Sequence, residues 1–251
     1  MPNPSQIRRH KGLIRHTLDQ LVMVDLLRFF LVGLRFFWFV RVLGRLKTLD
    51  ATGAVSAAVA GNTISHNLKG MVDLAVNRSH LLVRPLSVIE ALGVDARVLS
   101  VGPRTEGELF NLMAHGFSWA RIAGLDLISY SPKITLGDMH QSGLASSAFD
   151  AVVMGWVLAY SEEPARAAAE MVRITRSGGV IAVGVEYSPK SQEQIVAEIG
   201  YIPGAKARIE SCAQILGYFG DAVDHVYCNH VVAPDGLGST GALCVIFSIR
   251  K

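Results

Sequence analysis

The chain has 251 residues, half of them hydrophobic, which suits one domain of about 150–200 residues with a sizeable core and an extension. Three widely spaced cysteines, Cys212, Cys228 and Cys244, form no CxxC pair; this argues for a reducing compartment and against a disulfide framework or a metal site. The net charge of +3 is uneven, because residues 1–50 carry nine Lys and Arg against three Asp. A polyanionic partner would therefore meet the N-terminal end.

Residues 21–47, LVMVDLLRFFLVGLRFFWFVRVLGRLK, are apolar and aromatic but interrupted by arginines. The longest uncharged run in the aromatic part, 29–34, is much shorter than the roughly 18 residues of a membrane span. Arg28 and Arg35 share one helix face, and long arginines beside Phe and Trp suit a helix lying among lipid headgroups. We expect a basic amphipathic helix at the membrane surface; packing on the domain, or on a second subunit of a homodimer, is the alternative.

No small-residue cleavage site follows this apolar run, so it does not look like a secretory signal. The predicted location is cytoplasmic, with peripheral contact on the inner membrane face. Residues 51–70 are rich in Ala, Gly, Ser and Asn and suggest a loosely packed connection. We therefore divide the chain into a basic helical extension (1–50), a linker and helical cap (51–84) and a main domain (85–251).

Strand and helix signals alternate through the main domain. Short apolar runs predict strands at 97–102, 122–127, 149–156 and 180–187. Periodic segments predict helices at 105–116, at 161–179 and around 209–216, the second capped by Ser161 and stopped by Gly178–Gly179. Two final strands, 225–232 and 242–249, follow without a helix between them and should pair antiparallel.

This order predicts an α/β fold: a Rossmann-like, doubly wound, mostly parallel sheet with a terminal antiparallel hairpin, one reversed strand lying at an edge, plus the N-terminal helical extension. Ligands of such sheets bind beyond the carboxyl ends of the strands. The residues that follow the strands are therefore the candidate site: Gly102 to Gly107, Asp126, Asp138, Gly155–Trp156 and Glu186–Tyr187.

The motifs of residues 97–187 resemble those of class I S-adenosylmethionine-dependent methyltransferases, specifically the type 11 group. "RVLSVGPRTEG" is similar to the first motif, and "LDL" after the second strand to the acidic ribose-binding position. The run from "ITLGDMH" to "GGVIAVG" follows the later motifs in order and spacing. The resemblance implies S-adenosylmethionine as the cofactor.

The resemblance also implies roles for individual residues. Gly102, with Pro103 and Gly107 in the same loop, would let the backbone approach the methionine part of the cofactor. Asp126, followed by Leu127, would accept hydrogen bonds from the ribose hydroxyls. Asp138 would accept one from the adenine amine while Met139 packs on the ring. The methyl-donor side would be lined by Gly155 and Trp156, and Tyr130 would cover the adenine.

The first motif departs from the family pattern at three positions. Ser100 stands where an acid usually precedes the first glycine by two residues, and Arg104 and Glu106 replace the second and third glycines. We expect Glu106 to supply the missing carboxylate for the cofactor's ammonium group, while Arg104 holds its carboxylate or neutralises Glu106. A surface Arg–Glu pair without function is the alternative.

Methyl transfer mainly requires that donor and acceptor be positioned, with a general base if the acceptor is a hydroxyl. His140 is the candidate base, because histidine titrates near neutral pH; the alternative is a histidine that is exposed to solvent or only supports a residue of the site. Tyr160, Glu186 and Tyr187 are weaker candidates for the acceptor pocket.

The predicted function is methyl transfer to a small molecule, a glycan or a lipid-linked acceptor at the membrane surface. The alternative is a non-catalytic partner subunit of the same fold with a degenerate cofactor loop. A nucleic-acid substrate lacks support, since no NPPY-like motif and no basic, aromatic groove flank the site. An NAD-linked dehydrogenase fits less well, because "GPRTEG" departs further from GxGxxG.

Overall fold

The computed structural model describes residues 21–50, 55–60, 63–72, 74, 79–200, 204–205, 207–231 and 240–251. The first four basic residues of the predicted extension and most of the connection between the last two strands lie outside these ranges. Part of the predicted linker, residues 51–54, also lies outside them.

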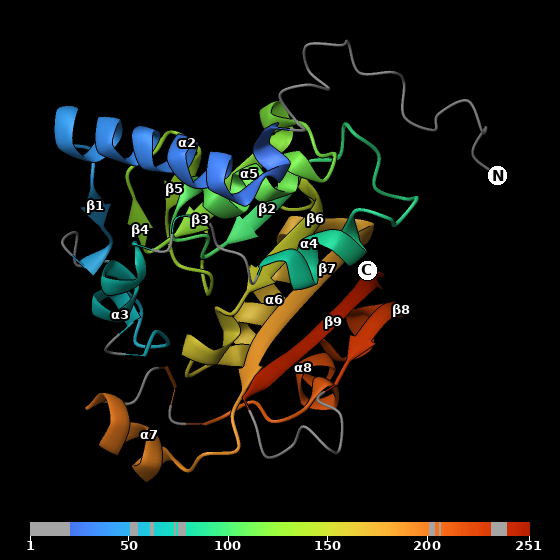
Figure 1. Cartoon of the computed structure of the whole chain (residues 1–251). Coiled ribbons are helices and arrows are strands. Elements are labelled where there is room, and N and C mark those ends of the chain that lie inside the picture. Colours follow the sequence, from blue (N-terminus) through green and yellow to red (C-terminus); the bar gives the residue numbers. More distant parts are fainter. Residues whose placement is uncertain are drawn as a thin grey trace.

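A seven-stranded sheet forms the centre of the molecule, in the order β5-β3-β2-β6-β7-β9-β8 (Figure 1). Neighbouring strands from β5 to β7 run parallel, and β9 is antiparallel to both β7 and β8. The strands are β2 (Val98–Val101), β3 (Ile122–Asp126), β5 (Ile134–Leu136), β6 (Phe149–Gly155), β7 (Thr175–Tyr187), β8 (Val223–His230) and β9 (Gly241–Ile249). A short pair, β1 (Lys47–Thr48) with β4 (Ile128–Ser129), lies beside it.

The doubly wound, mostly parallel sheet is thus confirmed, but the reversed strand is not at the edge as expected. Along the chain β8 precedes β9, but β8 lies at the edge of the sheet and β9 lies between β8 and β7. Both faces of β9 are buried, which its continuous apolar run from Leu243 to Phe247 permits.

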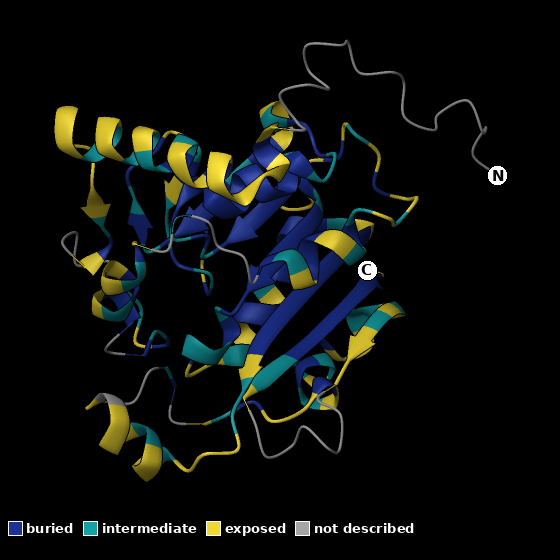
Figure 2. Cartoon of the chain, in the orientation of Figure 1, coloured by how far each residue is buried: buried dark blue, intermediate teal, exposed yellow. Residues whose placement is uncertain are grey.

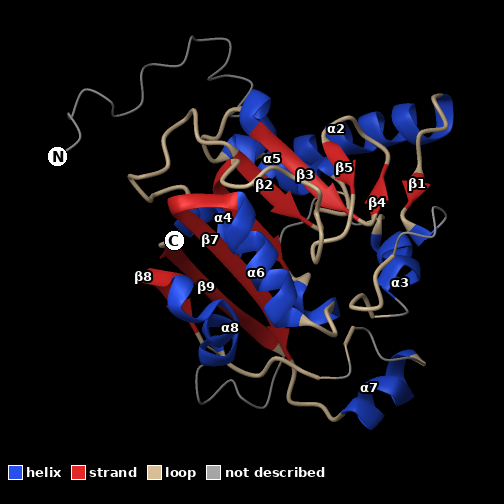
Figure 3. Cartoon of the chain, turned by 180° about the vertical axis from the view of Figure 1, so that it is seen from behind, coloured by secondary structure: helices blue, strands red, loops and turns tan. Residues whose placement is uncertain are grey.

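Alternate residues of the central strands belong to two separate cores, one on each face of the sheet. Val98, Val153 and Ala182 face one core, whereas Leu99 and Val152 face the other. The first core is closed by α4 (His80–Leu86) and α5 (Glu106–Ala114), and the second by α6 (Pro164–Ile174) and α8 (Cys212–Phe219). Figure 3 shows α6 and α8 on the face turned away from Figure 1. The sheet is therefore covered on both sides.

The N-terminal extension forms α2 (Asp25–Phe37), continued by a wider turn, η2 (Trp38–Val42). It packs outside α5, where Val22 and Val32 meet Phe110 and Ala114. Two shorter helices, α3 (Thr63–Gly70) and α7 (Gln192–Ile199), lie near the carboxyl ends of the strands (Figure 1). None of the helices in the described ranges is long and apolar enough to cross a membrane.

The helix expected over 161–179 is shorter at both ends. It begins at Pro164, whose fixed φ suits the first turn, with Glu163 rather than Ser161 at the N-cap. It ends at Ile174, and strand β7 starts at Thr175, so Gly178 and Gly179 lie inside the strand assignment. A register shift opposite Phe149 and Ala151 accommodates the two glycines.

Candidate functional site

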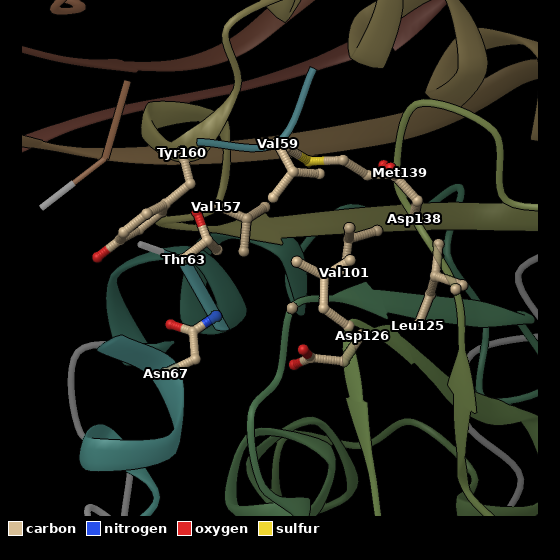
Figure 4. A pocket seen from close by; sticks show the side chains of 13 residues that line it. Val59, Thr63, Asn67, Val101, Leu125, Asp126, Asp138, Met139, Val157 and Tyr160 are labelled. Atoms are coloured by element: carbon tan, nitrogen blue, oxygen red, sulfur yellow. The ribbon is translucent and has the colours of Figure 1, made fainter. Parts of the chain in front are cut away.

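A pocket lies at the carboxyl ends of β2, β3 and β6, where the strand order changes direction (Figure 4). Helix α3 and the turn η6 (Leu158–Tyr160) close it on the other side. Its lining consists of Val59, Thr63, Asn67, Val101, Gly102, Leu125, Asp126, Leu127, Gly137, Asp138, Met139, Val157 and Tyr160.

Gly102 forms the tight turn that follows β2. Its φ is +67°, and its N–H donates to the carbonyl of Leu125 at 2.7 Å. A Cβ at this position would stand 2.0 Å from a methyl carbon of Val157, which packs on the glycine. Only glycine fits both the backbone conformation and this close approach.

Asp126 ends β3 and points into the pocket (Figure 4). One carboxylate oxygen accepts from the backbone N–H of Arg104 at 2.7 Å, and the other from that of Ile128 at 3.1 Å. Burial nevertheless raises the pKa of Asp126 to about 6, against the lowering effect of these hydrogen bonds. Each oxygen retains a lone pair, so the carboxylate can still accept two hydroxyl donors.

Asp138 is the second carboxylate in the lining. Its Oδ1 accepts from the backbone N–H of His140 at 2.8 Å and lies 2.5 Å from His140 Nδ1. Its Oδ2 accepts from the N–H of Ser56 at 3.3 Å. Burial opposes ionisation, but the His140 hydrogen bonds hold the pKa of Asp138 below its usual value.

His140 does not line the pocket, and its side chain is fully buried. Its Nε2 lies 2.6 Å from the hydroxyl of Ser161, so both ring nitrogens have partners. This arrangement does not support His140 as the base for an acceptor, as predicted from the sequence. His140 instead supports Asp138, which agrees with the supporting role named as an alternative and not with exposure to solvent.

Arg104 has a φ of +59°, the left-handed conformation for which the family pattern uses glycine. Its guanidinium reaches α3, 3.3 Å from Asn67 Oδ1 and 3.4 Å from the carbonyl of Gly70. The contact ties the Gly102 loop to the helix that forms the opposite wall. It does not form the expected pair with Glu106, which bonds elsewhere.

Glu106 is fully buried and faces away from the pocket, towards α2. Arg35 Nε donates to Glu106 Oε2 at 2.5 Å and Arg35 Nη2 to Oε1 at 2.9 Å. The hydroxyl of Ser131 donates to Oε1 as well. The expectation that Glu106 receives the cofactor's ammonium group is therefore not supported: its carboxylate is engaged in holding the N-terminal helix.

Five of the predicted cofactor residues share the pocket wall, namely Gly102, Asp126, Leu127, Asp138 and Met139. Four other predicted cofactor residues do not line it, namely Pro103, Gly107, Gly155 and Trp156, and Glu186 and Tyr187 are absent from the lining as well. Tyr130 is buried beneath α2, where its ring packs edge-on against Phe36, so it does not cover this pocket. Tyr160, a weaker candidate, does line it.

Sequence reasoning missed the wall contributed by α3. Thr63 and Asn67 lie four residues apart and so share one helix face, but the segment was interpreted as a connection because of its Ala, Gly and Ser content. The four-residue spacing of Thr63 and Asn67 was the one sequence signal that could have indicated this wall of the pocket.

The lining fits S-adenosylmethionine in chemical terms. The carboxylates of Asp126 and Asp138 offer the hydrogen-bond acceptors that a ribose and an adenine amine need. Val101, Leu125 and Met139 form apolar walls for the flat adenine ring. The Gly102 turn gives the backbone access that an amino-acid tail requires.

Comparison with known proteins agrees with this geometry. Residues 99–183 match the family model described as a methyltransferase domain. A Galdieria sulphuraria structure assigned as a sarcosine dimethylglycine methyltransferase has a TM-score of 0.51 at 12% identity, covering 70% of this chain and 86% of that chain. A Haloferax volcanii protein assigned as a methyltransferase, solved with the Trm112 activator, has a TM-score of 0.50 at 15% identity, covering 74% and 94%. No curated protein matches the chain.

The strand order, the reversed β9 and the pocket at the switch point define the fold of class I methyltransferases, which use S-adenosylmethionine. The methyltransferase-domain model matches residues 99–183, about a third of the chain. The fold predicted from the sequence is confirmed, and this match agrees with the predicted resemblance.

Proposed function

We propose that this protein transfers the methyl group of S-adenosylmethionine to a lipid-linked acceptor at a membrane surface. Methyl transfer rests on the methyltransferase domain and on the pocket described above. The choice of a lipid over a free small molecule or a glycan rests on helix α2 and on the groove beside it.

Helix α2 buries an arginine and exposes an apolar stripe on its outer side, which an ordinary surface helix does not do. Arg28 and Val32 are fully buried against the domain, one helical turn apart. Leu26, Phe30 and Leu34 repeat every four residues on the outside, and 62% or more of each is exposed. Figure 2 shows this exposed side of α2 along one border of the molecule. An outward apolar stripe of this length is a docking surface, since water-soluble surfaces seldom carry one.

The stripe continues into the exposed aromatics Phe37 and Trp38 and then meets exposed cations at Arg41, Arg45 and Lys47. Aromatic and aliphatic side chains beside Lys and Arg suit an anionic lipid surface better than a second copy of the same basic helix. The charge pattern therefore favours the membrane as the occupant of this face.

An apolar groove runs between the end of this helix and α3. It is lined by Phe36, Val40, Arg41, Leu46, Leu68, Met71, Val72 and Leu74. Helix α3 separates the groove from the cofactor pocket: Leu68 faces the groove, and its neighbour Asn67 lines the pocket. An acceptor with an apolar chain would lay that chain in the groove and reach past α3, one helix width of about 10 Å, to bring its polar end into contact with the cofactor.

The experiment separates a cell extract into a lipid fraction and a water-soluble fraction. Each is incubated with the protein and with S-adenosylmethionine that carries tritium in its methyl group. We expect label to enter the lipid fraction, and the Phe30→Ser/Leu34→Ser variant to lose most of that transfer. The same variant should bind vesicles of equal parts phosphatidylglycerol and phosphatidylcholine about tenfold more weakly, because two buried apolar contacts with lipid are lost.

A matched control replaces two exposed apolar residues far from α2, in Val88→Ser/Tyr227→Ser, and should leave transfer and vesicle binding unchanged. Label that enters only the water-soluble fraction would overturn the lipid acceptor. Self-association of the wild type that the Phe30→Ser/Leu34→Ser variant abolishes, without vesicle binding, would instead identify a second copy as the partner. If no fraction is labelled and S-adenosylhomocysteine does not bind, the protein is a non-catalytic subunit.

A further inference from the structure

Helix α3 presents a buried amide, Asn67, to the cofactor pocket, and this residue lies outside the segment that matches the methyltransferase-domain model. Asn67 is only 8% exposed. In Figure 4 it lies across the pocket from Asp138 and Met139, with Asp126 between them. Buried polar side chains in proteins have hydrogen-bond partners, so the partners of this amide indicate what it does.

Arg104 fixes which end of the Asn67 amide faces the pocket. Its Nη2 donates to Asn67 Oδ1 at 3.3 Å, and its Nη1 donates to the carbonyl of Gly70 at 3.4 Å. A guanidinium has donors and no acceptor, so the amide oxygen must face Arg104 and the NH2 group must face away from it. Figure 4 shows the nitrogen on the side of the pocket. Gly70 leaves room for this arrangement, because a Cβ there would stand 2.2 Å from Arg104 Nη1.

The NH2 group of Asn67 makes no hydrogen bond with the residues that the structure describes, where the contact with Arg104 is the one side-chain hydrogen bond of Asn67. Thr63, one turn earlier on the same wall, differs, because its hydroxyl already donates to the carbonyl of Ala60 at 2.7 Å. Burying an amide donor is unfavourable unless a partner replaces the water it has lost. A ligand with an oxygen at this point would be that partner.

The order of the residues along the pocket indicates which part of the cofactor reaches Asn67. With the adenine amine at Asp138 and the ribose at Asp126, the amino-acid tail extends past the Gly102 turn towards α3. The tail ends in an ammonium group, which only donates, and a carboxylate, which only accepts. The two N–H donors of an amide match the carboxylate, and the Arg104 guanidinium behind the amide polarises them towards an anion.

We propose that Asn67 donates to the carboxylate of the S-adenosylmethionine tail, and that Arg104 is a positioning residue that holds the Asn67 amide in the orientation this contact needs. The inference rests on the proposed cofactor site. It gives Asn67 one of the roles that the sequence suggested for Arg104, which does not line the pocket. Helix α3 thereby recognises the cofactor on one side and borders the acceptor groove on the other.

The test compares two ligands by calorimetric titration of the full chain. One is S-adenosylhomocysteine, and the other is its decarboxylated form, S-adenosyl-3-thiopropylamine, which keeps the ammonium group. In Asn67→Ala, we expect S-adenosylhomocysteine to bind about tenfold more weakly, because a hydrogen bond to a charged group is lost. The amine should bind within about twofold of its wild-type affinity, since it has no carboxylate to lose. Retained binding of the amine also shows that the variant is folded.

Asn67→Asp tests the charge of the ligand group. The new carboxylate keeps its contact with Arg104 but faces the ligand with a negative charge. Binding of S-adenosylhomocysteine should weaken further than in Asn67→Ala, because two carboxylates repel each other. The amine carries only a positive charge and should bind at least as tightly as it binds the wild type. The preference between the two ligands should therefore reverse.

Arg104→Gly tests the positioning role, because glycine keeps the left-handed turn and releases the Asn67 amide. The preference for S-adenosylhomocysteine over the amine should fall about threefold or more while binding of the amine is retained. A merely structural role would lower both affinities together. The matched control is Ser65→Ala on the exposed side of α3, which should leave both affinities unchanged.

Two outcomes with the Asn67 variants would overturn the carboxylate contact and leave the proposed function intact: equal losses for both ligands, and no loss for either. If neither affinity changes but Asn67→Ala needs more acceptor for half-maximal methyl transfer, Asn67 contacts the acceptor and the proposal is wrong. An unchanged preference in Arg104→Gly would overturn the role of Arg104. A wild-type protein that binds neither ligand would overturn the methyltransferase function as well.

Discussion

Two opposing influences act on the pKa of the Asp126 side chain. Its carboxylate accepts from two backbone N–H groups, yet burial dominates and raises its pKa to about 6. Hydroxyl donors from a ribose would stabilise the charged form, because a protonated carboxyl accepts less well. Ligand binding and ionisation of Asp126 are therefore linked.

We expect S-adenosylhomocysteine affinity to be constant above pH 7 and to fall about tenfold per pH unit below pH 6, where the free protein must first lose a proton. Titrations between pH 5 and pH 8 measure this. The Asp126→Asn variant should bind weakly with no such slope. An unchanged dissociation constant down to pH 5 in the wild type would show that this carboxylate does not contact the ligand.

Arg104 carries backbone strain that its side chain offsets. A left-handed conformation costs a non-glycine residue about 1–2 kcal/mol, and the contacts with Asn67 and Gly70 compensate. Arg104→Ala loses the contacts and keeps the strain, whereas Arg104→Gly loses both.

We therefore expect Arg104→Gly to be more stable than Arg104→Ala by about 0.5–1 kcal/mol, after the entropy cost of glycine is included. Urea unfolding of the two variants measures the difference. The hydrogen bond to Asp126 should survive in both, because its donor is the Arg104 backbone. Equal stability of the two variants would show that the φ of +59° is not strained here.

At the scale of the element, α2 is attached to α5 through charges as well as apolar contacts. Arg35 forms two hydrogen bonds with the fully buried Glu106, and these bonds raise the pKa of Arg35. The guanidinium also lies 5.2 Å from the ring centre of Phe39 and 5.8 Å from those of Phe110 and Trp119. Arg35 thus joins α2 to α5 both by charge and by contact with aromatic rings.

Replacing Arg35 by Met should loosen α2 more than removing both charges does. The single change leaves Glu106 buried without its cation, at a cost of about 3 kcal/mol, whereas Arg35→Met/Glu106→Gln leaves no buried charge. Hydrogen exchange in residues 25–37 should rise strongly in the single variant and less in the double one. If hydrogen exchange in α2 is as fast in the double variant as in the single one, loss of the ion pair itself, and not the unpaired charge of Glu106, loosens the helix.

At the scale of the whole molecule, the buried apolar contacts form three layers, whereas a sheet covered on both faces needs only two. The sheet is buried on both faces, by α4 and α5 on one and by α6 and α8 on the other. Helix α2 then adds a layer outside α5, with Arg28 buried and with Leu26, Phe30 and Leu34 exposed on its outer side (Figure 2). The proposed contact of α2 with lipid, beside the α3 wall of the pocket, would connect this exposed stripe with the proposed methyl transfer.

The sequence by itself determined the alternation of strands and helices, because parallel strands buried on both faces need continuous apolar runs and leave a strong pattern. It also located Gly102, Asp126 and Asp138, which directly follow or precede such runs and so reach one edge of the sheet. The helix boundaries at 161–179 and the position of the reversed strand were wrong. They depend on the register between β7 and its neighbours, which no local pattern records.

Only the tertiary structure decided where the two acids of the first helix point: Glu106 faces α2, where it binds Arg35, and Glu108 faces the sheet, where it binds Ser100. Glu106 and Glu108 are two positions apart, so their side chains leave the helix about 200° apart. Both are buried, because α5 lies between α2 on one side and the sheet on the other. The sequence shows two acids in one turn, but which of them faces the sheet depends on how α5 is rotated between its two neighbours, and that rotation is fixed by packing.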